Sequence, residues 1–168
     1  LHEYLLDDAE TVVVCLGSVT GTLRDVADER RENGDKIGIL SIVAFRPFPT
    51  EAVGKALKNA QRIIVLEKAF SVGIGGIVSA AIRPAVGYEG HTFYEVIAGL
   101  GGRDITKHSL HEYLDRAEAD SVEYTKFLDL DHDLIDRELA REAKNRRSGA
   151  IAENMVRDYH ERVAGSQN

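Results

Sequence analysis

The chain has 168 residues, of which 43% are hydrophobic and 29% are charged, and its formal net charge at pH 7 is −7. These values are typical of a globular protein with a sizeable core. The acidic excess argues against nucleic-acid and anionic-membrane partners, because such surfaces gather Lys and Arg, and no apolar run reaches the length of a membrane span. The single cysteine, Cys15, cannot form an internal disulfide or by itself hold an iron–sulfur cluster. We expect Cys15 to be a buried apolar side chain in a cytoplasmic protein.

Short apolar runs rich in β-branched residues alternate with segments of helical periodicity in the first two thirds of the chain. The predicted strands are 11–16, 36–44, 62–66 and 92–97. A predicted helix follows each strand, the first capped by Thr22 and the last opened by a capping box at Ser109–Glu112. Helices that alternate with near-continuous apolar strands are typical of a parallel sheet that is covered on both faces.

The predicted fold class is therefore a three-layer α/β/α domain with a mostly parallel sheet of four to five strands. We expect this domain to span residues 1–120. Residues 121–168 have a different character, with charged segments at 129–147 and 151–163 that carry thin apolar stripes of helical spacing. They are predicted to form a helical C-terminal extension that packs on this domain or on a partner, because isolated helices of this length are marginal.

Two glycine-containing turns could hold an anionic ligand, since each enters a helix whose backbone N–H groups would face it. The candidate residues are Gly17, Ser18, Thr20 and Thr22 in the first turn and Gly75 and Gly76 in the second. If the first and third strands are neighbours, both turns lie at one switch point of the sheet, where open α/β sheets bind ligands. The alternative interpretation is structural, a glycine turn with a threonine cap and a tightly packed glycine cluster.

Charged residues follow the ends of the second, third and fourth predicted strands. Arg46 precedes a proline and is a candidate for contact with an anion or a facing subunit, or else for hydrogen bonding to nearby carbonyl groups. Arg103 and Asp104 follow three glycines after the fourth strand and are the other candidate interface residues. Glu67 and Lys68 are interpreted as a surface pair of charges, with a general base as the alternative.

The motifs in these turns resemble a known family. They are Val13–Ser18 with Gly21 and Thr22, Phe45–Pro49, Ile64–Lys68 with Gly73, Gly75 and Gly76, and Gly99–Ile105. In this order they resemble the transketolase-C-terminal-like domain of 2-oxoacid:ferredoxin oxidoreductases, which is domain II of the alpha subunit of pyruvate:ferredoxin oxidoreductase. The resemblance covers roughly Ala9 to Asp120. It implies one antiparallel strand at the start of the fold, which only Leu1–Leu6 could supply.

The resemblance implies an enzyme that oxidatively decarboxylates a 2-oxoacid to an acyl-CoA, with thiamine diphosphate, Mg²⁺ and coenzyme A, and passes electrons through iron–sulfur clusters to ferredoxin. This chain lacks the Gly-Asp-Gly…Asn segment that would hold the thiamine diphosphate–Mg²⁺ group. We therefore expect no catalytic residue, cofactor or metal ligand here, and a structural role beside a pyrimidine-binding domain, a thiamine-diphosphate-binding beta subunit and a ferredoxin-like subunit. The alternative hypothesis is an independent module that binds an anionic small ligand such as coenzyme A or a nucleotide.

Overall fold

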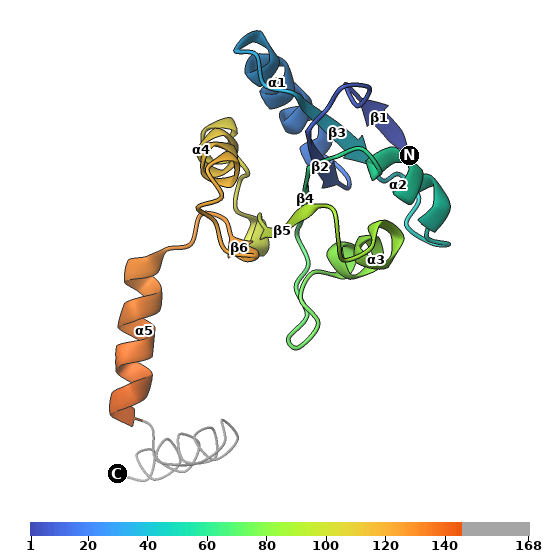
Figure 1. Cartoon of the computed structure of the whole chain (residues 1–168). Coiled ribbons are helices and arrows are strands. Elements are labelled where there is room, and N and C mark those ends of the chain that lie inside the picture. Colours follow the sequence, from blue (N-terminus) through green and yellow to red (C-terminus); the bar gives the residue numbers. More distant parts are fainter. Residues whose placement is uncertain (146–168) are drawn as a thin grey trace, which may run out of the picture. The chain divides into compact units, whose positions relative to one another are not determined.

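The computed structural model describes residues 1–145, which fall into a unit from Leu1 to Asp129 and a second unit that begins at Leu130. The strands are β1 (His2–Tyr4), β2 (Thr11–Cys15), β3 (Ile37–Ser41), β4 (Arg62–Glu67), β5 (Thr92–Ile97) and β6 (Thr125–Phe127). The helices are α1 (Val19–Glu32), α2 (Thr50–Leu57), α3 (Ile77–Val86), a short 3₁₀ turn at Leu100–Gly102, α4 (Lys107–Glu118) and α5 (His132–Asn145) (Figure 1). The predicted helix at 151–163 lies outside the described residues.

The first unit contains one six-stranded sheet in the order β1-β3-β2-β4-β5-β6. β1 runs antiparallel to β3, and every other pair is parallel. The mostly parallel α/β fold and the antiparallel first strand are thus confirmed. The strand number was underestimated, because β6 is a three-residue, half-buried strand without an apolar run, and it lies in the segment expected to form a helical extension.

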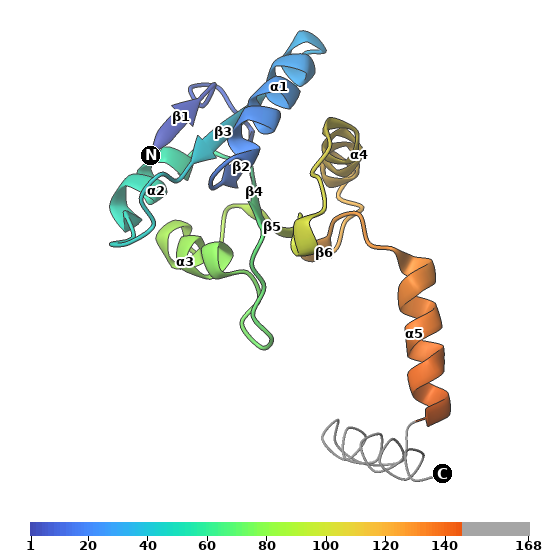
Figure 2. The same cartoon turned by 180° about the vertical axis from the view of Figure 1, so that it is seen from behind.

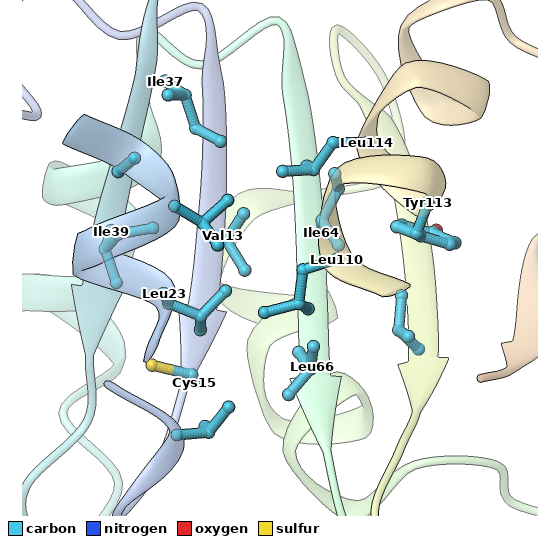
Figure 3. Close-up of a cluster of buried hydrophobic side chains, with 14 of the residues drawn as sticks. Val13, Cys15, Leu23, Ile37, Ile39, Ile64, Leu66, Leu110, Tyr113 and Leu114 are labelled. Atoms are coloured by element: carbon cyan, nitrogen blue, oxygen red, sulfur yellow. The ribbon is translucent and has the colours of Figure 1, made fainter. Parts of the chain in front are cut away.

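The two faces of the sheet are buried by different helices, as the paired views indicate (Figure 2). Along each strand the side chains alternate between two apolar clusters, because successive residues of a strand point to opposite faces. Val13 and Cys15 belong to the cluster that α1 and α4 cover, and Val12 and Val14 to the cluster that α2 and α3 cover. In the first cluster Leu23 of α1 and Leu110 of α4 lie over the strands (Figure 3). This arrangement is the predicted three-layer architecture.

Two helices begin earlier than their sequence signals predict. Ser18 occupies the N-cap position of α1, without a capping hydrogen bond from its side chain, so Thr22 lies inside the helix and the prediction of Thr22 as its cap was wrong. The positive φ of Gly17 (+75°) turns the chain into the helix immediately after β2. α4 is capped by Thr106, whose hydroxyl oxygen accepts the Ser109 N–H at 3.1 Å, so the helix cap lies three residues upstream of its predicted position at Ser109.

The second unit, as far as it is described, consists of α5. Its N-terminus is capped by Asp131, whose carboxylate accepts the Leu134 N–H at 2.9 Å. Among the helices of residues 1–145, none is long and apolar enough to cross a membrane.

Candidate functional site

The four sequence motifs meet at one edge of the sheet. Because β2, β3, β4 and β5 are parallel, the loops that follow them all leave from the same side. We call this side, with the loops 16–18, 42–49, 68–76 and 98–106, the carboxyl edge. β2 and β4 are neighbours, so the two glycine turns do follow adjacent strands at a switch point, as expected from the sequence.

The first glycine turn has its threonine directed into the protein. The Thr20 hydroxyl donates to the Gly17 carbonyl at 2.7 Å and lies 3.1 Å from the Ser41 hydroxyl and 3.5 Å from Cys15 Sγ. Gly17 and Ser18 are exposed. Of the predicted anion ligands in this turn, Thr20 is thus engaged inside the chain, while Gly17 and Ser18 face outward.

The second glycine turn leads into α3, and the N-terminus of this helix is occupied by Glu67. Its carboxylate accepts the N–H groups of Val78 and Ser79 at 2.8 and 3.0 Å and the Ser79 hydroxyl at 2.8 Å. Glu67 is 5% exposed, so its interpretation as half of a surface charge pair was wrong, whereas Lys68 is exposed. A carboxylate at this place is stabilised both by the hydrogen bonds and by the positive end of the helix dipole.

A second buried carboxylate reaches the same turn from the neighbouring strand. Glu95 lies in the middle of β5, is 3% exposed, and accepts the Gly76 N–H through Oε2 at 2.9 Å. The N–H groups around Gly76 are therefore paired with the chain's own carboxylates, which disfavour a further anion there by repulsion. Sequence reasoning missed this role of Glu95, although a single carboxylate within an otherwise apolar strand was the available signal.

Arg46 is exposed at the carboxyl edge, in the loop after β3. Its guanidinium lies over the Phe45 ring, 4.0 Å from the centroid, and donates to the Phe45 carbonyl at 3.2 Å. Phe45 packs edge-on against Phe48 at 5.6 Å, and the Arg46–Pro47 peptide bond is cis. The hydrogen bond to a nearby carbonyl that the sequence suggested as an alternative is thus present.

The loop after β5 is connected to the loop after β6 by Arg103. Its guanidinium donates to the Asp129 carbonyl at 2.6 Å, and both Arg103 and Asp104 are exposed. Gly99, Gly101 and Gly102 all have positive φ, between +68° and +81°, which is why glycines recur in this turn. The turn thus presents bare backbone and two charges at the edge.

The carboxyl edge also exposes apolar side chains. Val72 is 92% exposed, Ile74 70% and Val43 66%, and Ile77 and Leu100 are exposed as well. Exposed apolar side chains that gather on one face indicate a contact surface. Sequence reasoning missed them because apolar residues beside a strand are normally assigned to the core.

Cys15 is completely buried, as predicted, at the end of β2. Burial raises the pKa of its thiol, a shift that hydrogen bonds from Thr20 and Ser41 partly oppose. A protonated, inaccessible thiol is a poor nucleophile, so the geometry gives Cys15 a packing role.

Comparison with known proteins identifies related chains. Residues 9–110 match the family model described as pyruvate:ferredoxin oxidoreductase core domain II. The chain is 36% identical over 147 residues to pyruvate synthase subunit PorA of Methanosarcina barkeri, covering 79% of this chain and 35% of that protein. It is 38% identical over 132 residues to the alpha subunit of the NADH-dependent phenylglyoxylate dehydrogenase of Aromatoleum evansii, covering 71% of this chain and 29% of that protein.

A solved structure shares the fold. The 2-oxoglutarate:ferredoxin oxidoreductase of Magnetococcus marinus, solved with 2-oxoglutarate, coenzyme A and succinyl-CoA bound, matches with a TM-score of 0.52 and 20% identity over 68% of this chain and 18% of that one. This chain spans about a third of the length of the curated relatives that it matches. On the family match and on the similarity to these relatives, the chain belongs to the pyruvate:ferredoxin oxidoreductase core domain II family.

Proposed function

We propose that this chain is domain II of the alpha subunit of a thiamine-diphosphate-dependent 2-oxoacid:ferredoxin oxidoreductase, and that its role is assembly without chemistry of its own. The complete enzyme would oxidatively decarboxylate a 2-oxoacid to an acyl-CoA and pass the electrons to ferredoxin. Relatives named for pyruvate and for phenylglyoxylate match this chain to similar degrees, which supports assigning the choice of 2-oxoacid to other parts of the enzyme.

The observation that carries the proposal is the exposed apolar surface at the carboxyl edge. Val43, Val72, Ile74 and Leu100 come from three different loops, all of which leave the sheet at this edge. Apolar side chains in such numbers are unfavourable in water and are stabilised when another protein surface covers them. The occupant we propose is another domain or subunit of the same enzyme.

Three charged residues add polar contacts around this surface. Arg46, Arg103 and Asp104 are exposed in the same loops as Val43 and Leu100, and interfaces combine an apolar centre with a polar rim. Arg103 is also tied to Asp129 within the chain, so its guanidinium is already oriented. We propose these three residues as interface contacts.

The proposed partners are a pyrimidine-binding domain, a thiamine-diphosphate-binding beta subunit and a ferredoxin-like subunit, with ferredoxin reached indirectly. Thiamine diphosphate, Mg²⁺, iron–sulfur clusters and coenzyme A would be held by those parts. Cys15 is a free buried thiol, which agrees with a reducing compartment and hence a cytoplasmic enzyme.

The proposal is tested by assembly of the chain with the remaining domains and subunits, measured by size-exclusion chromatography with light scattering. Val72→Asp places a charge where an apolar side chain would be buried, and Arg103→Ala removes a polar contact. Both variants are expected to weaken assembly, Val72→Asp by roughly 2 kcal/mol or more and Arg103→Ala by about 1–2 kcal/mol, without unfolding the chain. If the Val72→Asp variant assembled as tightly as the wild type does, the carboxyl edge would be excluded as the contact surface.

Two controls match these variants in chemistry and differ in place. Leu5 is exposed and directly follows β1. Because β1 runs antiparallel to β3, Leu5 lies near the start of β3, so Leu5→Asp introduces the same charge away from the carboxyl edge. Arg116, an exposed arginine on α4 that bonds Glu112 within the chain, matches Arg103. Leu5→Asp and Arg116→Ala are expected to assemble as the wild type does.

The second part of the proposal, that the chain does no chemistry, has its own assay. The isolated chain is mixed with pyruvate, coenzyme A, thiamine diphosphate, Mg²⁺ and ferredoxin, and ferredoxin reduction is followed spectroscopically. No reduction above the protein-free rate is expected. Turnover by the isolated chain would contradict a purely structural role.

A further inference from the structure

An open cleft of about 590 Å³ lies beside α3, away from the Gly17 turn. Its lining includes the loop Gly73–Gly75, the helix residues Ser79 and Arg83, Glu95 of β5, and Tyr124 and Thr125. This volume is in the range of pockets that hold small molecules.

Two of the side chains that line this cleft each carry a buried polar atom with no hydrogen-bond partner among the described residues. One is Glu95 Oε1, on a side chain that is 3% exposed and whose other oxygen accepts the Gly76 N–H. The other is Nη1 of Arg83. An unpaired buried carboxylate oxygen is costly, so such atoms in a folded protein call for a partner that is supplied from outside the chain.

Aromatic rings lie beside the Arg83 guanidinium. The Arg83 guanidinium lies over Tyr88 and Phe93, 5.0 and 4.6 Å from the ring centroids. Tyr124 is stacked on Phe93 with an interplanar angle of 25°. Tyr88 is 74% exposed and Tyr124 53% exposed, so flat aromatic faces are available at the mouth of the cleft.

The charges of the cleft select the kind of ligand. A bare cation would pair with Glu95 but be repelled by Arg83, and a bare anion would pair with Arg83 but be repelled by Glu95. A neutral group that carries an N–H donor beside a carbonyl acceptor offers a partner of the right kind to each of the two unpaired atoms. Aromatic walls favour a flat group.

We propose that this cleft binds a flat, uncharged amide-type group, with its N–H donating to Glu95 Oε1 and its carbonyl oxygen accepting from Arg83. The amide comes either from a free carboxamide or lactam, or from a neighbouring segment of the complete enzyme. The cleft is a feature of the chain by itself, so the inference does not depend on the assembly role proposed above.

The test uses three probes of one shape, benzamide, benzoate and benzamidinium, which are titrated at millimolar concentration into the full chain. Binding is read from the NMR shifts of the Gly75, Gly76 and Thr125 amides, because the Gly76 N–H bonds directly to Glu95. Benzamide, which both donates and accepts, is expected to give saturable shifts and to bind more tightly than the other two probes.

Two substitutions should change the preference in opposite directions. In Glu95→Gln the amide oxygen keeps the hydrogen bond from the Gly76 N–H, while an NH₂ group replaces the unpaired acceptor. The affinity for benzamide is therefore expected to fall about tenfold and the affinity for benzoate to rise. In Arg83→Met the guanidinium donor is lost, so the affinity for benzamide is expected to fall and the affinity for benzamidinium to rise. Arg24→Met is the control, since Arg24 also lies over a tyrosine, Tyr4, at 5.1 Å but belongs to α1; no change is expected.

The inference is overturned if wild-type chain gives no saturable shifts with benzamide, in which case water satisfies the two atoms. It is also overturned if benzamidinium or benzoate binds more tightly than benzamide to the wild type, or if the substitutions leave the relative affinities of the three probes unchanged. Repeating the titration on the assembled enzyme distinguishes the two sources. Retained binding indicates a free ligand, and binding lost only on assembly indicates a neighbouring segment.

Discussion

A side chain at position 76 would collide with the Glu67 carboxylate, since an ideal Cβ built on Gly76 would lie 2.0 Å from Glu67 Oε1. The backbone of Gly76 has φ of −70°, which any residue adopts, so the requirement for glycine here is one of space. The close approach lets Glu67 reach the N–H groups of Val78 and Ser79. Gly76 therefore leaves the space that Glu67 needs to cap the N-terminus of α3.

Gly76→Ala is expected to destabilise the chain by roughly 1–3 kcal/mol, because the methyl group must displace a buried carboxylate from its hydrogen bonds. Chemical denaturation monitored by circular dichroism measures the free energy of unfolding. Gly21→Ala is the matched control. A Cβ at Gly21, inside α1, meets nothing within 4 Å, and alanine there should stabilise the chain by about 0.5–1 kcal/mol. Equal effects of the two substitutions would contradict the proposed steric role of position 76.

Glu67→Ala is expected to lower the free energy of unfolding by roughly 2–4 kcal/mol, because it removes the acceptor for two helix N–H groups and one hydroxyl. Glu10→Ala is a control that removes an exposed carboxylate, paired with Lys36 at 2.6 Å, and should cost under about 1 kcal/mol. Hydrogen exchange should locate the loss in the first turn of α3. Unchanged protection of Val78 and Ser79 would argue against the cap.

Two buried tyrosines should respond oppositely to loss of their hydroxyl groups. Tyr113 Oη has no partner among the described residues, and burial raises the pKa of its phenol. Tyr94 Oη donates to Asp120 at 3.0 Å. Tyr113→Phe is therefore expected to be neutral or to stabilise by about 1 kcal/mol, and Tyr94→Phe to destabilise by about 1 kcal/mol. Thermal denaturation measures both, and a loss of stability in Tyr113→Phe would reveal a partner for that hydroxyl.

Burial of Cys15 predicts a pH dependence of stability at alkaline pH. An unfolded thiol has a pKa of about 8.5, and burial raises the pKa in the folded chain. The folded state therefore keeps a proton that the unfolded state releases. The resulting stabilisation is complete below about pH 8.5 and is lost as the pH rises from there towards the folded-state pKa.

Comparison with Cys15→Ala isolates this effect, because the other titrating groups are common to both chains. The difference in unfolding free energy between wild type and Cys15→Ala is expected to shrink by up to about 1.4 kcal/mol per pH unit above pH 8.5. Iodoacetamide should react with the folded wild type only on the timescale of unfolding. Rapid alkylation at pH 7 would contradict the buried position.

Local patterns in the sequence determined the architecture of the sheet. Apolar runs such as 11–16 and 62–66 are long enough to be buried on both faces, and the helices between them require parallel connections. From parallel strands it follows that the loops bearing Arg46 and Arg103 share one edge. The burial of Cys15 follows from the same run of apolar neighbours.

Only the tertiary structure decided what happens at that edge. Glu67 and Glu95 are separated by 28 positions along the chain. Both carboxylates nevertheless accept backbone N–H groups at or just after Gly76, because β4 and β5 are neighbours. β6 is too short and lacks the apolar run by which the other strands were predicted, and it forms where β5 offers it a free edge for pairing. Sequence patterns report which face of an element is apolar, whereas a buried charge is placed by whichever distant backbone N–H groups the fold brings within hydrogen-bond distance of it.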